Sequence, residues 1–357
     1  MSESRVVELE SGLLTLKVIR SEFSLDSLLG FASRENPRRG FLLVSKVLGR
    51  HWPVRPQVLE RAASILAAGL EPDLPGPVLF VALAETATLL GALVYEAYRL
   101  GGREDLAFIQ TSRYQVGEVA LTSHEPHSHA PAHYLHLPLD PEARRVFLEA
   151  RSLVLIDDEL TTGTTLKNLS GAYRDLNPHL LEERWVALTS FLANGQSPVA
   201  LLQGELEFAP DPNFVPAPAI ALAPQERVIK FIDPGRLGYC QPPRPNLEVP
   251  PMVGRTLILG TGEFTYLPFQ IARRLEAGGS EVYFQALTRS PIRIGGAIGA
   301  KIALRDPYGQ GVPHFLYNVK PDSYERILVW AEPGALPELP LELRPKVEEI
   351  NCELSPF

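Results

Sequence analysis

Two adjacent carboxylates and a run of hydroxyl groups lie within one short segment, residues 153–165, whose sequence is LVLIDDELTTGTT. The apolar residues 152–156 predict a buried strand, which would present Asp157 and Asp158 at its carboxyl end, where ligand-binding groups collect in open parallel sheets. A predicted helix over residues 166–176 follows the hydroxyl-rich loop, so the backbone amides of the loop can bind an anion. The loop residues with this predicted role are Thr161, Thr162, Gly163, Thr164 and Thr165.

The pair of carboxylates decides which anion fits this segment. Two negative charges beside the loop would repel a bare polyphosphate, but they suit the vicinal hydroxyls of a ribose whose phosphate occupies the loop. A simple helix start would need only one Asp and one Thr as capping residues. A Walker-type loop is excluded because no Gly-Lys-Ser/Thr follows, and Lys167 lies too far along the chain. The segment therefore predicts a site for a ribose 5-phosphate.

Five of the eight histidines lie close together, in or just after a long polar loop expected over residues 112–132. Two of them, His127 and His129, are spaced closely enough to bind a metal, but a polar loop does not by itself hold metal ligands in a convergent arrangement. The alternative is a loop that closes over a ligand, with imidazoles as hydrogen-bond donors or a proton relay. We favour loop closure over a metal site. The five residues are His124, His127, His129, His133 and His136.

Polar groups also follow two apolar stretches in the last third of the chain, residues 256–259 and 281–287. If both stretches are neighbouring parallel strands, the polar residues after them share one crevice and predict a second ligand site. The glycines alone are weak evidence for a dinucleotide, because Thr265 occupies the position of the third glycine. The predicted residues of this second site are Gly260, Gly262, Glu263, Thr288, Arg289 and Ser290.

Composition limits the class of protein. The chain has 357 residues, of which 45% are hydrophobic, which suggests about two domains with apolar cores. A net charge of -8 gives no electrostatic case for a nucleic-acid partner. We see neither a signal peptide nor an apolar run near the roughly 18 residues of a membrane span, so we expect a cytoplasmic protein without membrane contact. The two cysteines, Cys240 and Cys352, define neither a metal site nor a disulfide framework.

Apolar strands alternate with helical segments between residues 78 and 192, which predicts a parallel sheet with helices on both faces. Prolines are dense over residues 194–252, which we interpret as an extended connection. We therefore expect an α/β protein with a first domain at residues 1–193, a connection at 194–252 and a smaller α/β domain at 253–357. The expected strands of the first domain are residues 78–83, 106–111, 134–137, 152–156 and 185–192.

The segment around Asp157 and Asp158 resembles the ribose-phosphate signature of type I phosphoribosyltransferases. The resemblance extends to residues 82–91 (ALAETATLLG), which follow the first strand where that family binds pyrophosphate. It also includes residues 111–114 (TSRY), as in orotate phosphoribosyltransferase-like enzymes. Residues 39–51 (RGFLLVSKVLGRH) and 287–291 (LTRSP) look like the bacterial proteins that fuse this domain to a C-terminal TRSP domain. Such proteins are associated with tellurium-resistance and stress gene clusters.

The resemblance implies a type I phosphoribosyltransferase fold, with a five-stranded, mostly parallel sheet and an N-terminal hood, and displacement at C1 of phosphoribosyl pyrophosphate. Asp157 and Asp158 would hold the ribose hydroxyls and reach Mg²⁺ only through the ligand, while Arg113 would close the site. Glu85 is unexpected beside pyrophosphate: it would bridge through Mg²⁺, face an acceptor amine, or merely favour a helix dipole. The other residues that would approach the substrates are Ala84, Thr86, Lys46, Arg50, His51, His127 and His129.

Lys46 and Arg50 are four residues apart and would share one face of a helix. By themselves they predict only a solvated basic face, whereas the resemblance implies a hood that contacts substrate.

The resemblance thus implies a Mg²⁺-dependent transfer of ribose 5-phosphate in the synthesis of a nucleoside-like metabolite, with an acceptor that the sequence does not name. Two other functions stay open. The first domain could be a sensor that binds phosphoribosyl pyrophosphate or a nucleotide without transfer, although a sensor has no need of Arg113 and a closing loop. The C-terminal domain could instead be the principal enzyme, such as a hydrolase. A homodimer is a candidate assembly.

Overall fold

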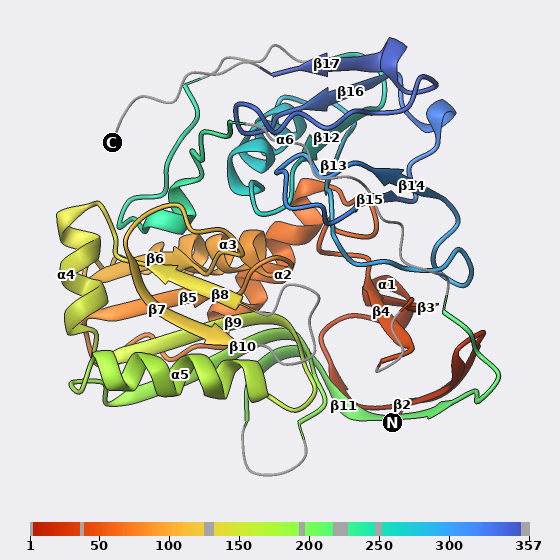
Figure 1. Ribbon diagram of the computed structural model, residues 1–357. Coiled ribbons are helices and arrows are strands. Elements are labelled where there is room, and N and C mark those ends of the chain that lie inside the picture. The colour runs from red at the N-terminus through yellow and green to blue at the C-terminus, as the bar shows by residue number, and fades with distance from the viewer. Residues whose placement is uncertain are drawn as a thin grey trace.

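A large sheet runs through the first two thirds of the chain in the computed structural model, which describes residues 3–35, 39–124, 132–192, 197–216, 228–246 and 252–350 (Figure 1). Within those residues it has seven strands, in the order β1-β2-β11-β10-β9-β5-β6. The five strands from β11 to β6 run parallel, and β2 and β1 extend them in antiparallel pairs. The bounds are β1 Glu3–Leu9, β2 Gly12–Ser21, β5 Val78–Ala82, β6 Leu106–Gln110, β9 Ser152–Leu160, β10 Glu182–Ser190 and β11 Val199–Pro210.

Both faces of the central strands are buried, which is why these strands read as continuous apolar runs. Phe80 and Ile156 belong to one core cluster, which they share with the helices α2 (Pro56–Ala68) and α3 (Thr88–Arg99). Leu79 and Leu155 point to the other face, into a second cluster with α4 (Pro141–Glu149) and α5 (Thr164–Leu176). The expected α/β architecture, a mostly parallel sheet covered on both faces, is therefore confirmed.

Two hairpins lie outside the large sheet. After the short helix α1 (Leu25–Leu28), β3 (Leu29–Ser33) pairs with β4 (Phe41–Ser45). Farther along, β7 (Val119–His124) pairs with β8 (Ala132–His136). The prediction of one long loop over residues 112–132 was therefore wrong for its middle part. A strand forms there because Leu121 packs with Leu135 in the core cluster under α4 and α5.

The predicted connection begins with a strand of the large sheet. Residues 194–252 contain β11, whose Leu201 and Leu202 are buried in the main core. Apart from Pro198, which precedes this strand, the prolines that suggested a connection begin at Pro210, its last residue. After it the chain passes along the first domain, where Tyr239 pairs with Phe108 of β6 near the 3-10 helix Pro234–Leu237. The sheet of the first domain thus extends to residue 210.

A smaller, wholly parallel sheet forms the last part of the chain, in the order β13-β12-β16-β17. One helix, α6 (Tyr266–Ala277), follows β12, and β14 (Lys301–Leu304) pairs antiparallel with β15 (His314–Tyr317). The strands of the sheet are β12 Thr256–Gly260, β13 Val282–Ala286, β16 Arg326–Val329 and β17 Val347–Glu349, with 3-10 turns at Pro321–Ser323 and Arg344–Lys346.

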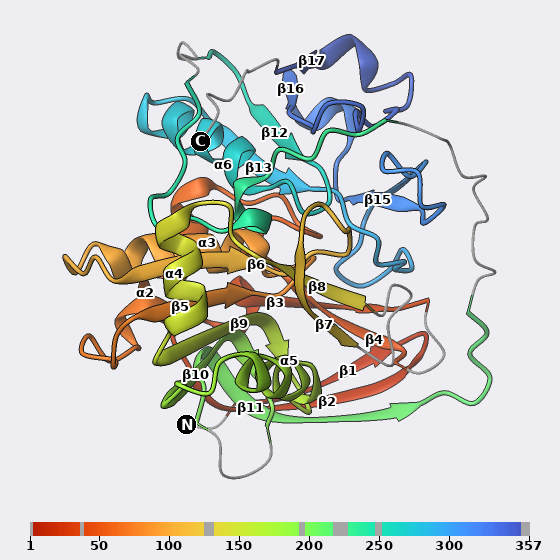
Figure 2. The ribbon, with the colours of Figure 1, turned by 60° about the vertical axis from the view of Figure 1, so that its left-hand side comes forward.

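The two sheets share one apolar core. Phe269 of α6 and Phe284 of β13 belong to the same buried cluster as α2 and α3, and Val54 pairs with Phe284 across the junction. Figures 1 and 2 both show α6 next to α2 and α3, with the C-terminal sheet beyond it. The C-terminal domain is therefore packed against the first domain over a common core. No helix in the described ranges is both long and apolar enough to cross a membrane.

Candidate active site

The carboxylates Asp157 and Asp158 occupy the last part of β9. This strand continues to Leu160, whereas the neighbouring β5 ends at Ala82, which pairs with Ile156. The two aspartates therefore project past the end of β5 into open space. The backbone N–H of Asp158 donates to Oδ1 of Asp157 at 2.9 Å.

The hydroxyl-rich loop turns the chain from β9 into α5. Gly163 caps the helix with φ 69°, a left-handed conformation, and a Cβ there would lie 2.6 Å from the Trp185 ring. Both facts demand glycine at this position. The Oγ1 atoms of Thr162 and Thr164 lie 3.0 Å apart, and the N–H of Thr164 donates to Oγ1 of Thr162 at 3.3 Å. Helix α5 has 13 residues, so its positive end faces the same loop.

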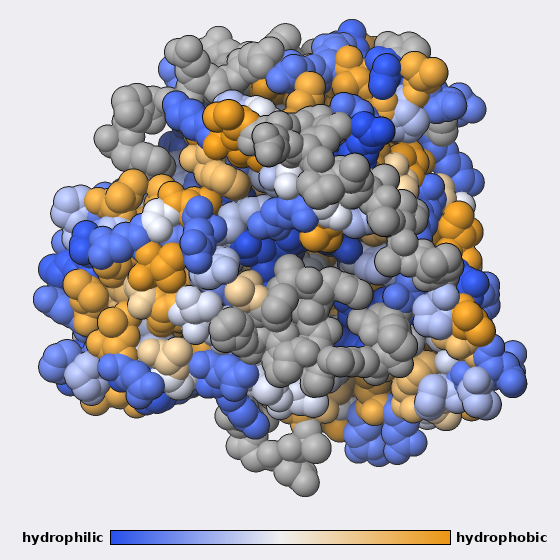
Figure 3. Space-filling model, in the orientation of Figure 1, coloured by the Kyte–Doolittle hydropathy of each residue, from blue (hydrophilic) through white to orange (hydrophobic). Residues whose placement is uncertain are grey.

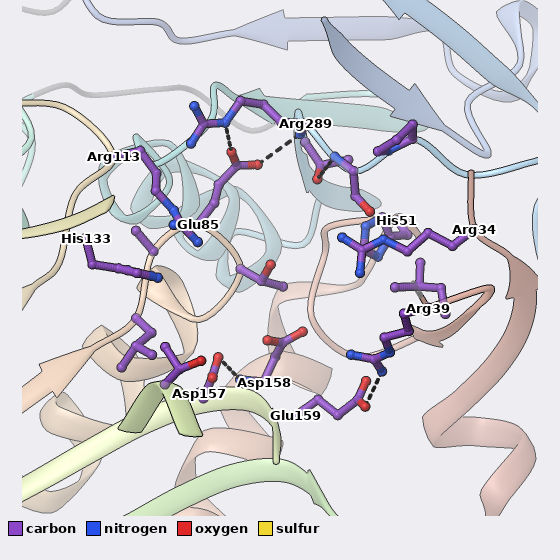
Figure 4. Close-up of a pocket in the computed structure, with 18 of the residues that line it drawn as sticks. Arg34, Arg39, His51, Glu85, Arg113, His133, Asp157, Asp158, Glu159 and Arg289 are labelled. Atoms are coloured by element: carbon purple, nitrogen blue, oxygen red, sulfur yellow. Dashed lines mark hydrogen bonds and ion pairs between the residues drawn. The ribbon is translucent and has the colours of Figure 1, made fainter. Parts of the chain in front are cut away.

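A polar cavity of about 240 Å³ lies in front of these groups. Figure 3 shows a recess with hydrophilic residues between the lower part of the molecule and the upper part, and Figure 4 shows the cavity itself. We call three parts of its lining the floor (Asp157, Asp158, Thr161, Thr165), the loop side (residues 84–86, Arg113, His133) and the composite side (Arg34, Arg39, Leu42, His51, residues 288–291, Val312).

The loop side begins directly after β5. The N–H of Ala84 donates to Oγ1 of Thr111 at 2.8 Å, and this hydroxyl lies 3.0 Å from Nδ1 of His133. The peptide bond between Ala84 and Glu85 is cis. Arg113 borders the cavity, and its backbone N–H donates to Glu263, while its role in closing the site stays a prediction.

Glu85 is held by two arginines. Its carboxylate accepts from Nε of Arg289 at 2.8 Å and lies 3.5 Å from Nη1 of Arg50. Burial alone would raise the pKa of Glu85, but the two guanidinium groups outweigh it and lower the pKa to about 2. The carboxylate is therefore ionised and already paired with arginines. This pairing argues against two of the roles considered for Glu85, contact with an acceptor amine and interaction with a helix dipole.

The basic residues after β4 separate in the structure, because residues 46–50 are bends and not a helix. Arg50 is buried, at 2% exposure, and donates to the carbonyl oxygens of Gly262, Leu287 and Glu85 at 2.6–2.7 Å. Lys46 lines a different hollow, near Trp52. The expectation that Lys46 and Arg50 share a helix face was therefore wrong.

His51 does reach the cavity. It is 5% exposed, and burial together with the nearby cations of Arg50 and Arg34 lowers its pKa to about 3. The imidazole is therefore neutral near pH 7.

Two of the predicted histidines, His127 and His129, lie outside the described residues, as does the side chain of His124. His136 is buried, and its Nε2 accepts from the N–H of Val116 at 3.1 Å, away from the cavity. In the described part of the chain, no three His, Cys, Asp or Glu side chains form a group that could hold a metal ion.

The residues of the expected second site fall into two groups. Thr288, Arg289 and Ser290 line the same cavity as the aspartates. Glu263 is fully buried instead, in an ion pair of 2.8 Å with Arg236, and Gly260 and Gly262 lie beside it in the chain. This buried pair takes Glu263 out of reach of a ligand, so the predicted crevice with its own ligand does not form as one site.

Three charged residues at the cavity escaped the sequence analysis. Arg34 and Arg39 come from the β3–β4 hairpin, and Glu159 follows directly after the two aspartates. Arg39 forms an ion pair with Glu159, whose pKa is raised by burial and only partly restored by that arginine. The one signal for Glu159 was its place beside the two aspartates. Arg39 begins the segment 39–51 that carries the resemblance, but no role was predicted for it, and Arg34 had no signal of its own.

Comparison with known proteins agrees with this geometry. Residues 28–211 match a family described as phosphoribosyl transferase, and residues 246–344 match the TRSP domain that lies C-terminal to it. No curated protein matched the sequence.

Solved structures resemble part of the chain at low identity. A hypoxanthine phosphoribosyltransferase from Staphylococcus aureus is 16% identical over 44% of this chain and 78% of that chain, with a TM-score of 0.29. An adenine phosphoribosyltransferase from Thermoanaerobacter pseudethanolicus is 21% identical over 41% and 81%, also with a TM-score of 0.29. Such low scores carry no argument about this chain, whereas the family match spans more than half of it. The chain belongs to the phosphoribosyl transferase family and carries a TRSP domain C-terminal to the transferase domain.

Proposed function

We propose that this protein transfers ribose 5-phosphate from phosphoribosyl pyrophosphate to an acceptor, or catalyses the reverse reaction. The observation that carries the proposal is the floor of the cavity, where two adjacent carboxylates meet a hydroxyl-rich loop at a helix N-terminus. Asp157 and Asp158 accept hydrogen bonds from the ribose hydroxyls. The amides and hydroxyls of residues 161–165 bind the 5-phosphate.

The loop side receives the pyrophosphate. Its backbone at residues 84–86 borders the cavity beside Arg113, whose guanidinium group balances charge on the departing pyrophosphate. In the forward direction the bond from C1 to pyrophosphate oxygen breaks, the bond from C1 to the acceptor nitrogen forms, and the acceptor proton passes to solvent. Positive charge develops on the ribose during this displacement, and the carboxylates of the floor stabilise it.

Magnesium fits the oxygen-rich floor. Mg²⁺ prefers oxygen ligands and keeps several waters, so Asp157 and Asp158 would hold it through the bound ligand and those waters. When bound, the ion supplies positive charge to the pyrophosphate group. This role needs no group of protein ligands that encloses the metal.

The test combines binding and turnover in the full chain. We expect Asp157→Asn with Asp158→Asn to weaken phosphoribosyl-pyrophosphate binding by about 1.5–3 kcal/mol for each carboxylate, because each loses charged hydrogen bonds. Titration calorimetry with Mg²⁺ measures the affinity, and thermal unfolding checks that the variant is folded. Unchanged affinity of the double variant would remove the proposal.

Turnover distinguishes an enzyme from a sensor. Pyrophosphate release is followed with phosphoribosyl pyrophosphate, Mg²⁺ and a mixture of small nitrogenous acceptors, and mass spectrometry identifies the product. We expect release to stop in excess EDTA. Tight binding without release or exchange of pyrophosphate under any of these conditions would favour a sensor that binds the same ligand.

A further inference from the structure

The composite side of the cavity is built from the N-terminal hairpin region and from the last third of the chain. The β3–β4 hairpin and the C-terminal domain share a small buried cluster that includes Ala32, Ile292 and Phe315. Backbone hydrogen bonds join them: Arg293 N–H donates to the Ser33 carbonyl at 2.9 Å. The N–H of Glu35 also donates to the carbonyl of Pro291, at 3.0 Å. The N-terminal hairpin and residues 288–298 therefore form one structural unit above the floor.

The hairpin part of this unit lies across the cavity from Arg113 and His133 of the loop side, whereas Arg289 reaches the loop side itself, where its Nε donates to Glu85 at 2.8 Å. Figure 4 shows Arg113 and His133 on one side, Arg34 and His51 on the other, and Asp157 below between them. In a displacement at C1, the leaving group and the incoming acceptor occupy opposite faces of the ribose. If pyrophosphate leaves toward the loop side, the acceptor must approach from the composite side.

Two buried polar atoms of uncharged side chains on the composite side have no hydrogen-bond partner among the described residues. They are Nε2 of His51 and Oγ of Ser290. One tyrosine, Tyr317, holds both residues in place: its hydroxyl donates to the Ser290 carbonyl at 2.8 Å, and its ring lies 6.0 Å from the imidazole of His51. A buried polar atom without a partner is costly, so two of them on one side indicate a ligand that supplies the missing hydrogen bonds.

The other groups on this side narrow the chemistry of that ligand. Leu42, Pro291 and Val312 offer apolar surface, which suits a flat ring. The composite side carries three arginines, Arg34, Arg39 and Arg289, of which Arg39 pairs with Glu159 and Arg289 pairs with Glu85. The balance of charge is positive, which favours a ligand with an acidic group.

We propose that residues 288–291 of the TRSP domain, together with Arg34 and His51, form the acceptor subsite of the transferase, and that its acceptor is a nitrogen heterocycle with an acidic group. The inference rests on the proposed function. It assigns Ser290 and His51 the hydrogen bonds to the ring and Arg34 the acidic group. The TRSP domain thereby completes the active site of its neighbour.

The experiment uses matched acidic and neutral probes on the full chain, with ribose 5-phosphate filling the floor so that no transfer occurs. Titration calorimetry compares orotate with uracil and nicotinate with nicotinamide. We expect the acid of at least one pair to bind at least about tenfold tighter than its neutral partner, an order typical of one charge-assisted hydrogen bond. Equal affinities in both pairs, or no binding of either acid, would overturn the acidic acceptor.

Two variants test the residues. We expect Arg34→Gln to abolish the preference for the acidic probe over the neutral one. Ser290→Ala should weaken binding of the acidic probe about fivefold or more, through loss of one hydrogen bond. Both should leave ribose 5-phosphate affinity within about twofold. The control is Arg326→Gln, which removes an exposed arginine of β16 and should change neither affinity.

The two possible failures are distinguishable. If either variant weakens binding of ribose 5-phosphate as much as binding of the probe, residues 288–291 and Arg34 belong to the ribose-phosphate site. The assignment of an acceptor subsite would then be wrong. If ribose 5-phosphate and phosphoribosyl pyrophosphate both fail to bind the unmodified protein, the proposed function fails first.

Discussion

The floor and the composite side of the cavity differ in how the chain builds them. The floor comes from one continuous stretch, residues 157–165, in which a strand end, a glycine turn and a helix start follow each other directly. The composite side depends on contacts between distant segments, such as the bond from Arg50 to the carbonyl of Leu287, which are 237 residues apart. The floor therefore depends on interactions between neighbouring residues, whereas the composite side is held in place by buried ion pairs. Changes to the floor should therefore affect ligand binding, and changes to the buried ion pairs between distant segments should affect stability.

The largest effect is expected at Arg236, which is fully buried. It bonds Glu263 at 2.8 Å and Glu332 at 2.6 Å, and Glu263 in turn accepts from Ser112 and Arg113. Replacing Arg236 with methionine leaves two buried carboxylates without their cation, which should lower the free energy of unfolding by about 3–5 kcal/mol. Urea unfolding followed by circular dichroism measures this change.

Arg326→Met serves as the control for charge removal, because this arginine is exposed on β16. It should change the free energy of unfolding by no more than about 0.5 kcal/mol. If both variants change the free energy of unfolding by the same amount, the buried ion pairs of Arg236 do not stabilise the fold more than an exposed pair does.

A somewhat smaller effect is expected from Glu85→Gln, and it should depend on pH. The pKa of Glu85 in the folded protein is about 2, below the ordinary value of 4.5, so its ionised form stabilises the fold above about pH 4.5. That shift corresponds to a loss of stability on the order of 3 kcal/mol in the variant at pH 7. As the pH falls from 4.5 toward 2, Glu85 becomes protonated in the unfolded chain while it stays ionised in the folded one, so the difference in stability between the two proteins should shrink.

Urea unfolding of the wild type and Glu85→Gln at pH 7, 4.5 and 3.5 tests this expectation. A constant difference at all three pH values would mean that the ion pairs of Glu85 with Arg289 and Arg50 do not stabilise the fold.

The smallest effect on stability is expected in the hydroxyl-rich loop between β9 and α5, which includes Thr161 and Thr165 of the floor. Thr162→Val removes the contact of its hydroxyl with Thr164 and the bond from the N–H of Thr164, both of them exposed. The free energy of unfolding should fall by about 1 kcal/mol or less, as for the loss of a helix cap. Phosphoribosyl-pyrophosphate binding, measured by calorimetry, should weaken at the same time. A stability loss as large as that of Arg236→Met would erase the contrast between the two regions.

This contrast also explains what the sequence could predict. The strand before Asp157 and the loop after it follow from local patterns, since apolar runs, glycine turns and helix starts depend on neighbouring residues. The strand β7 was missed because Leu121, its member of the core cluster, pairs with Leu135 across a hairpin, which no local pattern indicates. β11 was missed because a proline-rich stretch follows it, although Leu201 and Leu202 place it in the sheet.

The site was predictable to a similar extent. Asp157, Asp158 and Thr161 were found from their types and spacing. Arg289 was found as a polar residue at a strand end, but it was assigned to a separate crevice because nothing in the sequence shows that Glu85, 204 residues earlier, is its partner. Arg34 had no local signal, because only the tertiary contact between the hairpin and residues 288–298 brings it to the cavity.

The β3–β4 hairpin and residues 288–298 lie far apart in the sequence, and this affects the order in which the chain folds during synthesis. The ribosome delivers the N-terminal hairpin and the floor first, and domains generally fold in that order. The cluster of Ala32 with Ile292 and Phe315 can form only after the last third of the chain has emerged. Contacts of this kind form late and slow down folding. A nascent or truncated chain would thus have the loop of residues 161–165 but an open cavity, and only a chain that includes the last third encloses it.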